Sequence, residues 1–282
     1  MMKIDAHQHF WIYSAAEYEW IDDSMAGLQH DFLPRDLEPL LAASGFGGSI
    51  AVQARQSLEE TRWLLELAAQ NDFIRGVVGW VDLCSPEIGA QLENFAQNKK
   101  LVGVRHVVQG EPDDEFMLRP TFRRGIGLLN QFGLAYDLLL YPRHLPVAAM
   151  LVREFPEQRF VLDHIAKPRI AEGVLQPWAR DIHELGKAPN VACKLSGMVT
   201  EARWKQWKPA DFRPYLEIVL EAFGPARLMI GSDWPVCTVS ADYGETMGLV
   251  TGFIESLSAA ECNGILGGNC VRAYGLGDGV QD

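Results

Sequence analysis

The sequence predicts an α/β protein folded as a closed, TIM-like (β/α)8 barrel of parallel strands. Eight short apolar runs recur along the 282 residues, and amphipathic, helix-like segments separate them. Several of the runs are apolar almost throughout, which is typical of parallel strands covered on both faces. Eight strand-and-helix units in succession predict a barrel whose functional site lies at the C-terminal face, where the strands end.

The eight runs are predicted to form strands in chain order. They cover residues 2–6, 49–53, 74–81, 102–108, 134–140, 160–163, 191–195 and 228–231. Amphipathic helices are predicted at 57–70, 86–98, 122–131, 145–155 and 215–222. Ser57 and Glu60 have the spacing of a capping box at a helix start, and Pro86 suits the first turn of the following helix.

A single barrel domain is expected over residues 1–276, with a loose tail over 277–282. An open, doubly wound sheet is the alternative architecture. That fold would need a glycine-rich phosphate-binding loop after the first strand. This chain has His7-Gln8-His9 there instead, which favours the closed barrel.

Charge and composition limit the partners of the chain. Its formal net charge is −12 at pH 7, and an acidic surface repels phosphate backbones and anionic lipids. Neither nucleic acid nor a membrane is therefore expected as a partner. No window approaches the roughly 18 apolar residues of a membrane helix, and the first residues lack the pattern of a signal peptide. Five widely spaced cysteines without a C-x-x-C pair indicate a cytoplasmic location rather than a disulfide framework.

The strongest candidate for chemistry is the pair His7 and His9 at the end of the first predicted strand. Residues two apart in a strand share a face, so both imidazoles are expected to point into the barrel mouth. Two imidazoles in this arrangement bind one metal ion or one carbonyl oxygen. The alternative is a pair of structural histidines.

Two further candidates follow later strands. His164 ends the sixth predicted strand, and Asp233 follows the eighth. Barrel closure brings the eighth strand beside the first, so Asp233 is expected to face His7 and His9. There it can serve as a metal ligand, a general base, or both. A core histidine and a helix N-cap are the respective structural alternatives.

Several phrases together resemble the amidohydrolase superfamily: D-A-H-Q-H-F-W, V-G-V-R-H, L-D-H-I-A-K-P, K-L-S-G and G-S-D-W-P. Within it, the chain is similar to the sugar-lactonase branch, which includes fuconolactonases, rhamnonolactonases and the pyrone-dicarboxylate lactonase. The resemblance extends from Ile4 to Leu276. It implies a (β/α)8 barrel that hydrolyses a small cyclic ester.

The chain departs from the metal-dependent members of this superfamily. Those usually carry a carboxylated lysine or a glutamate on the fourth strand and a histidine on the fifth. Here the fourth strand ends in Arg105 and His106, and the fifth carries Asp137. A binuclear metal site is therefore not expected. A single divalent ion such as zinc, held by His7, His9 and Asp233 with or without His164, stays open, and the resemblance favours catalysis that does not require it.

The resemblance implies a role for each candidate in lactone hydrolysis. Water needs a general base, and the developing oxyanion needs positive charge nearby. Asp233 is the expected base. Arg105, His7 and His9 are expected to polarise the carbonyl, and His164 is expected to orient water or substrate. Other polar or aromatic residues at strand ends or in the long loops at 10–34 and 197–214 are candidates for binding a polyol: Gln53, Asp137, Lys194, Trp204 and Trp11.

The leading functional prediction is a lactonase that opens an aldonolactone, such as L-fuconolactone or a related six-carbon or deoxy-sugar lactone, during carbohydrate catabolism. A metal-dependent amidohydrolase or non-oxidative decarboxylase of the same fold is the alternative. A non-catalytic barrel that binds a small ligand is a third hypothesis. The convergence of three histidines and an aspartate at one barrel end disfavours that third hypothesis.

Overall fold

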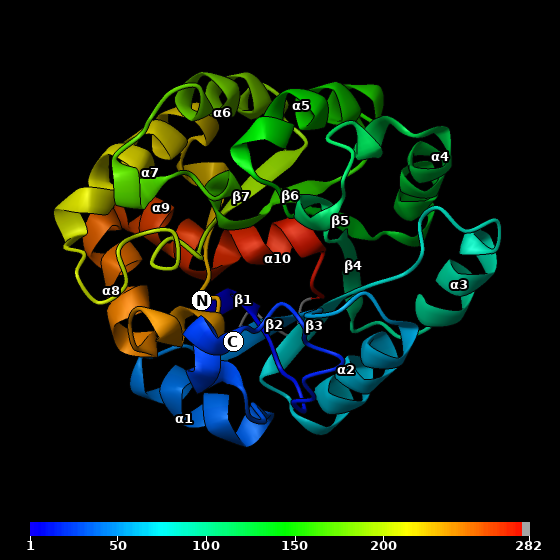
Figure 1. The fold of residues 1–282 in the computed structure, drawn as a ribbon, viewed down its shortest axis with the longest axis horizontal. Coiled ribbons are helices and arrows are strands. Elements are labelled where there is room, and N and C mark those ends of the chain that lie inside the picture. The colour runs from blue at the N-terminus through cyan, green and yellow to red at the C-terminus, as the bar shows by residue number, and fades with distance from the viewer. Residues whose placement is uncertain (278–282) are drawn as a thin grey trace.

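Eight parallel strands form the centre of the molecule, as the apolar runs predict. The computed structural model describes residues 1–277, and the strands pair in sequence order from first to last (Figure 1). They are β1 (Ile4–Gln8), β2 (Gly48–Val52), β3 (Ile74–Gly79), β4 (Leu101–His106), β5 (Ala135–Leu138), β6 (Phe160–Leu162), β7 (Val191–Leu195) and β8 (Leu228–Ile230). The predicted (β/α)8 fold class is confirmed.

The barrel closes between β8 and β1 at the level of the candidate site. Asp233 N donates to His7 O at 2.8 Å, and His9 N donates to Trp234 O at 2.7 Å. A parallel bridge joins Gln8 to Trp234. These hydrogen bonds fix Asp233 beside His7 of β1 and His9 directly after it, so closure itself assembles part of the site.

Helices surround the strands, as Figure 1 shows in a view down the barrel. They are α1 (Pro34–Ala43), α2 (Leu58–Gln70), α3 (Ile88–Phe95), α4 (Pro120–Leu129), α5 (Leu145–Glu154), α6 (Trp178–Gly186), α7 (Pro209–Phe223), α8 (Tyr243–Ile254), α9 (Ala259–Asn263) and α10 (Asn269–Tyr274). The short helix α10 crosses the centre of that view. Its Cys270 and Tyr274 pack against inward-facing residues of the strands, including Ile50 and Val161.

Most element boundaries lie close to those predicted, and the differences have local causes. β1 begins two residues later than predicted, because pairing with β2 starts at Ile4 opposite Gly48. α7 begins at Pro209 rather than 215, where the Asp211 side chain accepts from Lys208 N. At α2, Ser57 Oγ accepts from Glu60 N as the capping box predicts. The Glu60 carboxylate, however, turns to Ala54 N and Arg55 N, each at 3.0 Å.

Three further observations concern the tail, the helices and the cysteines. The expected tail at 277–282 lies, apart from Gly277, outside the described residues. Across residues 1–277, none of the helices combines the length and the apolar character needed to cross a membrane. The five cysteines are all free thiols.

Candidate active site

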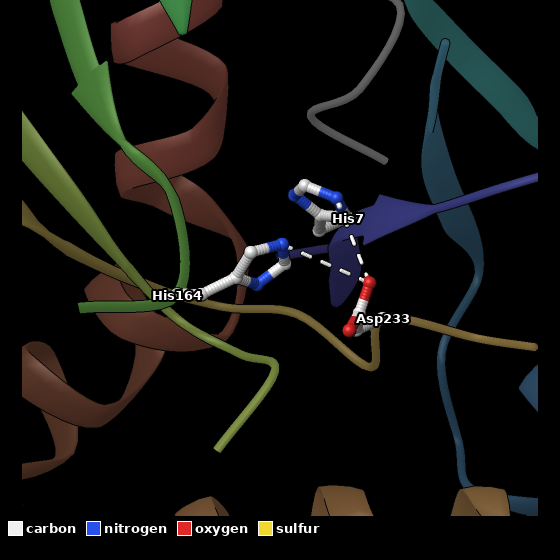
Figure 2. Close-up of side chains that lie close together, drawn as sticks. All are labelled: His7, His164 and Asp233. Carbon is white, nitrogen blue, oxygen red and sulfur yellow. Dashed lines mark ion pairs between the residues drawn. The ribbon is translucent and has the colours of Figure 1, made fainter. Parts of the chain in front are cut away.

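Three histidines and an aspartate meet at the C-terminal ends of the strands. His9 Nε2 lies 3.2 Å from His7 Nε2 and 3.3 Å from Asp233 Oδ1. Asp233 Oδ1 also lies 3.8 Å from the Nε2 atoms of His7 and His164. Figure 2 shows His7 and His164 near each other, each facing the carboxylate of Asp233. All four side chains are buried, so their charges act in a poorly solvated environment.

The second ring nitrogen of His7 and of His9 has its own partner. In a neutral His9 ring, Nδ1 donates to Val52 O at 2.8 Å, and Nε2 is then an acceptor. His7 Nδ1 lies 3.2 Å from both a donor, Lys194 Nζ, and an acceptor, Asp163 Oδ1. The protein can therefore hold either neutral tautomer of His7. Burial, then the Lys194 charge, lowers the His7 pKa well below its usual range.

The two tautomers of His7 have different uses. With the proton on Nε2, the ring accepts from Lys194 and donates to His9 Nε2. With the proton on Nδ1, the ring donates to Asp163, and Nε2 offers a lone pair to a ligand. A partner behind each imidazole is typical of metal-binding histidines.

The donor set fits a single divalent metal ion. Ligand atoms of His7, His164 and Asp233 all lie within 4.8 Å of one another. His9 Nε2, fixed as an acceptor, is a further ligand atom beside them. Imidazole and carboxylate donors suit zinc. The Arg105 guanidinium, 3.3 Å from His7 Nε2, is a fixed positive charge beside this donor set.

His164 belongs to an unusual left-handed turn that follows β6. Four successive residues, His164 to Lys167, have φ values between 48° and 60°. Such values are rare outside glycine and cost about 1–3 kcal/mol each when the fold enforces them. Trp178 Nε1 holds the turn by donating to Ile165 O at 2.8 Å. Strain of this kind clusters at functional sites, and here it places His164 and Lys167 on the pocket wall.

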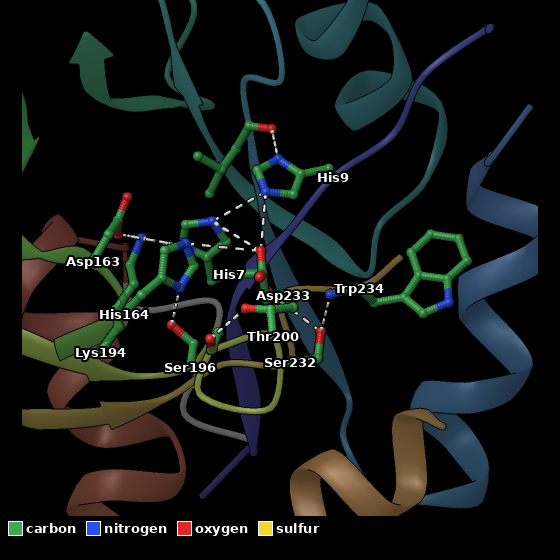
Figure 3. A network of polar contacts seen from close by, with 12 residues as sticks. His7, His9, Asp163, His164, Lys194, Ser196, Thr200, Ser232, Asp233 and Trp234 are labelled. Atoms are coloured by element: carbon green, nitrogen blue, oxygen red, sulfur yellow. Dashed lines mark hydrogen bonds and ion pairs between the residues drawn. The ribbon is translucent and has the colours of Figure 1, made fainter. Parts of the chain in front are cut away.

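The loop after β7 supports the His164 ring. Ser196 Oγ lies 2.9 Å from His164 Nδ1. Gly197 has φ +62°, and a Cβ there would lie 2.4 Å from the same nitrogen. The ring therefore needs a residue without a side chain beside the nitrogen that contacts Ser196, a contact drawn in Figure 3. Burial lowers the His164 pKa to about 4, which keeps the ring neutral at pH 7.

Gly197→Ala is expected to lower kcat at least about tenfold, because the added methyl group displaces the His164 ring (proximity losses of this kind reach about a hundredfold). Gly173→Ala is the matched control. Gly173 has φ +67°, but a Cβ there meets nothing within 4 Å. The control should lose about 1 kcal/mol of stability to the left-handed backbone and keep its kcat. Equal activity of the two variants would contradict this role of Gly197.

A buried ion cluster underlies the histidines. Asp163 lies 2.9 Å from Arg105 Nη1, 2.9 Å from Lys194 Nζ and 3.2 Å from His7 Nδ1. Lys194 Nζ also lies 2.6 Å from Asp137, which accepts from Tyr274 Oη at 2.7 Å. Two cations thus balance two carboxylates around a neutral ring. Burial opposes the Asp163 charge, but Lys194 and His7 outweigh it and hold the pKa of this carboxyl well below its usual range.

The donors of Arg105 are occupied within the protein. Nε and Nη2 donate to Gln53 Oε1 at 3.2 and 2.8 Å, Nη2 also donates to Gln53 O, and Nη1 donates to Asp163. The other Nη1 hydrogen faces His7 Nε2. Arg105 reaches the pocket wall, but it contributes charge and positions its neighbours rather than offering a free donor to a ligand.

A pocket of about 490 Å³ opens above these residues, a size suited to a small ligand. His9, Arg105, His164 and Asp233 contribute to its floor and walls. Loops after the strands supply the other walls, which combine polar and apolar side chains: Ala16, Glu17, Glu19, Trp20, Ala54, Arg55, Gln56, Val107, Gln109, Leu139, Lys167 and Val236. The site can bind a polar molecule and polarise it.

The structure does not place the five expected substrate-binding residues on this pocket. Gln53, Asp137 and Lys194 are completely buried, because their positions in the strands lie below the rim and their polar groups serve the ion cluster. Trp11 is buried under the loop that it begins, with Nε1 donating to His30 O. Trp204 donates to Thr200 O within its own loop.

Sequence reasoning missed several residues that the structure brings to the site. Trp20 lines the pocket in place of Trp11, and Arg55 lines it after β2. Asp163 and Lys167 flank His164 in the phrase L-D-H-I-A-K-P. A charged residue directly before His164 in an otherwise apolar strand was a usable signal for Asp163.

A (β/α)8 barrel with histidines and an aspartate gathered at its C-terminal face defines a hydrolase of the amidohydrolase type. The family model described as Amidohydrolase matches residues 4–276. The chain therefore belongs to the amidohydrolase family, and the predicted resemblance is confirmed.

Two curated relatives bear the name L-fucono-1,5-lactonase. The protein of Burkholderia multivorans is 43% identical over 98% of this chain and 96% of its own length. That of Burkholderia ambifaria is 40% identical over 86% of this chain and 83% of its own length.

Solved structures agree with this assignment. Crystal structures of an amidohydrolase from Burkholderia multivorans, one with bound HEPES and one with bound zinc, match with a TM-score of 0.95 at 42% identity, covering 98% of this chain and 100% of that one. A probable 2-pyrone-4,6-dicarboxylic acid hydrolase from Acinetobacter baumannii shares the fold, with a TM-score of 0.79 at 18% identity over 98% of this chain and 100% of that one.

Proposed function

We propose that this protein hydrolyses a sugar-acid lactone to the free acid, as a carboxylic-ester hydrolase of carbohydrate catabolism in the cytoplasm. One observation carries the proposal: the Asp233 carboxylate faces three imidazoles at the base of the pocket. The two relatives named L-fucono-1,5-lactonase support L-fucono-1,5-lactone, or a closely related aldonolactone, as the substrate.

In this proposal Asp233 is the general base. Burial opposes its charge, but His164 and His9 outweigh burial and lower the pKa of Asp233, so the carboxylate is ionised at neutral pH. When His9 is neutral, its Nε2 is an acceptor, like Asp233 Oδ1, and the two atoms lie 3.3 Å apart. A water molecule has two hydrogens, so it can donate to both atoms and present its oxygen lone pair to the lactone carbonyl.

The reaction balances without a further reactant. The water oxygen bonds to the carbonyl carbon, and its proton passes to Asp233. The tetrahedral intermediate then expels the ring oxygen, which takes that proton and becomes a hydroxyl group. The product is the open-chain hydroxy acid, which ionises to a carboxylate in solution, and Asp233 is regenerated as its anion.

His7 supplies a donor for the carbonyl oxygen in this proposal. In the tautomer that accepts from Lys194, His7 carries its proton on Nε2, on the side of the other imidazoles. A neutral imidazole of this kind can donate one hydrogen bond to a developing oxyanion. Arg105 adds positive charge beside it. His9, expected from sequence to polarise the carbonyl, is oriented here as an acceptor.

His7, His9, His164 and Asp233 would hold a zinc ion, as the bound zinc of the Burkholderia multivorans amidohydrolase suggests. When bound, the metal would polarise a carbonyl oxygen or lower the pKa of water. We propose that turnover does not require it, because a lactone is already a reactive electrophile and the chain itself supplies a base, a donor and positive charge.

A panel of aldonolactones tests the proposal, with native and chelator-treated enzyme compared by a pH indicator and spontaneous ring opening subtracted. We expect fast turnover of one stereochemical series and retention of most of the activity after exhaustive chelation. No turnover across the panel would contradict the lactonase. Complete loss on chelation with rescue by zinc would instead support the metal-dependent alternative, which the fit of the donor set to zinc favours.

A further inference from the structure

Three basic side chains line the pocket, and two of them already have anionic partners. Arg55 pairs with Glu17 at 2.5 Å and lies over the ring of Tyr18. Arg105 is held by Asp163 and Gln53. The third is Lys167, which is half-buried on the pocket wall. Within residues 1–277, its Nζ has neither an ion pair nor a hydrogen bond.

The left-handed turn after β6 places Lys167 at the site. Lys167 ends the left-handed turn that carries His164, and its N–H donates to His164 O at 2.8 Å. Its own φ is 49°, a conformation that costs energy for a residue with a side chain. Lys167 Nζ lies 5.9 Å from the centre of the Tyr141 ring, which limits the space open to it. The turn thus presents an imidazole and an ammonium group to one pocket.

We propose that Lys167 binds the oxygen that derives from the lactone carbonyl, first as the oxyanion of the transition state and then in the carboxylate of the product. This inference rests on the proposed function. A lactone is neutral, so an unpaired ammonium group gains most when negative charge develops on that oxygen. Lys167 lines the same pocket as Asp233 and His164, and its charge lowers the pKa of both.

With this assignment, Lys167 and His7 together supply the hydrogen-bond donors for the oxyanion. When His7 Nε2 accepts from Arg105, Arg105 has no free donor, and when His7 Nε2 is protonated, it offers one hydrogen bond. A charged donor with three hydrogens completes an oxyanion site beside the imidazole. The same contact defines the ligand class of the pocket as an open-chain polyhydroxy carboxylate in addition to the neutral lactone.

The test compares wild-type enzyme with Lys167→Met, Lys167→Arg and the control Lys99→Met. Lys99 is exposed in the loop before β4, at the opposite end of the barrel. We expect Lys167→Met to lower kcat about a hundredfold with a smaller change in KM, as for loss of one oxyanion donor. Lys167→Arg should recover part of kcat, and Lys99→Met should match wild type. A Lys167→Met variant within threefold of wild type would overturn the proposal.

Binding separates this inference from the proposed function. Calorimetry with sodium L-fuconate needs no turnover, and L-fucitol serves as the neutral comparator. We expect Lys167→Met to bind L-fuconate at least tenfold more weakly than wild type does and to leave L-fucitol binding unchanged. This result supports the anion contact even if no lactone is hydrolysed. Equal L-fuconate affinity of the two proteins, or no L-fuconate binding by wild type, would overturn it.

Discussion

Asp233→Asn is expected to lower kcat at least about a hundredfold, the lower end for loss of a positioned general base. Asparagine keeps the size of the side chain but cannot accept the proton of the attacking water. The backbone hydrogen bond from residue 233 to His7 O, which closes the barrel, is unaffected by the substitution. We therefore expect the variant to fold with nearly wild-type stability, so that the loss measured in a steady-state assay reports chemistry.

Asp72→Asn is the matched control for this substitution. Asp72 is exposed just before β3, at the N-terminal end of the barrel, and the substitution changes the net charge by the same amount. The control should retain wild-type kcat. Turnover by Asp233→Asn close to that of Asp72→Asn would remove Asp233 from the role of base.

Lys194→Met is expected to destabilise the fold by about 3–5 kcal/mol, the usual result of removing one partner from a buried ion pair. Lys194 Nζ contacts both Asp137 and Asp163, and all three side chains are completely buried. Methionine would leave two carboxylates with Arg105 as the one remaining cation of the cluster. Denaturant unfolding monitored by circular dichroism measures the loss.

An exposed pair provides the comparison for this second prediction. Lys187 Nζ lies 2.5 Å from Glu184, and its side chain is 71% exposed. Lys187→Met should change stability by less than about 1 kcal/mol, because water already solvates both groups. A similar small change for Lys194→Met would show that the ion cluster is not a structural requirement. If Lys194→Met does not fold, the milder Lys194→Arg should still shift the midpoint downward.

The barrel and the centre of its site follow from simple regularities of sequence. Strand alternation brings His7 and His9 together, and barrel closure adds Asp233. Arg105 is the penultimate residue of β4, and His164 follows β6 by two residues. Strand order thus brings these five residues to one end of the barrel, and a sequence shows that order.

The remainder of the site depends on features that periodicity does not encode. The depth of Asp137 and Lys194 below the rim decides that they pair with each other rather than reach the pocket. The left-handed turn at His164 to Lys167 contradicts the ordinary preferences of its residues, so its direction cannot be read from them. Trp11 and Trp20 lie in one loop, and three-dimensional packing alone decides that Trp20 lines the pocket.

The proposed reaction is the opening of a sugar-acid lactone at the Asp233 site. Proton NMR of L-fucono-1,5-lactone with wild-type enzyme, Asp233→Asn and buffer alone tests it most directly. We expect the wild-type enzyme to convert the lactone rapidly to L-fuconate. After subtraction of the buffer rate, the rate for Asp233→Asn should be at least about a hundredfold lower. Conversion by wild type at the buffer rate would contradict it, as would equal enzymatic rates for the two proteins.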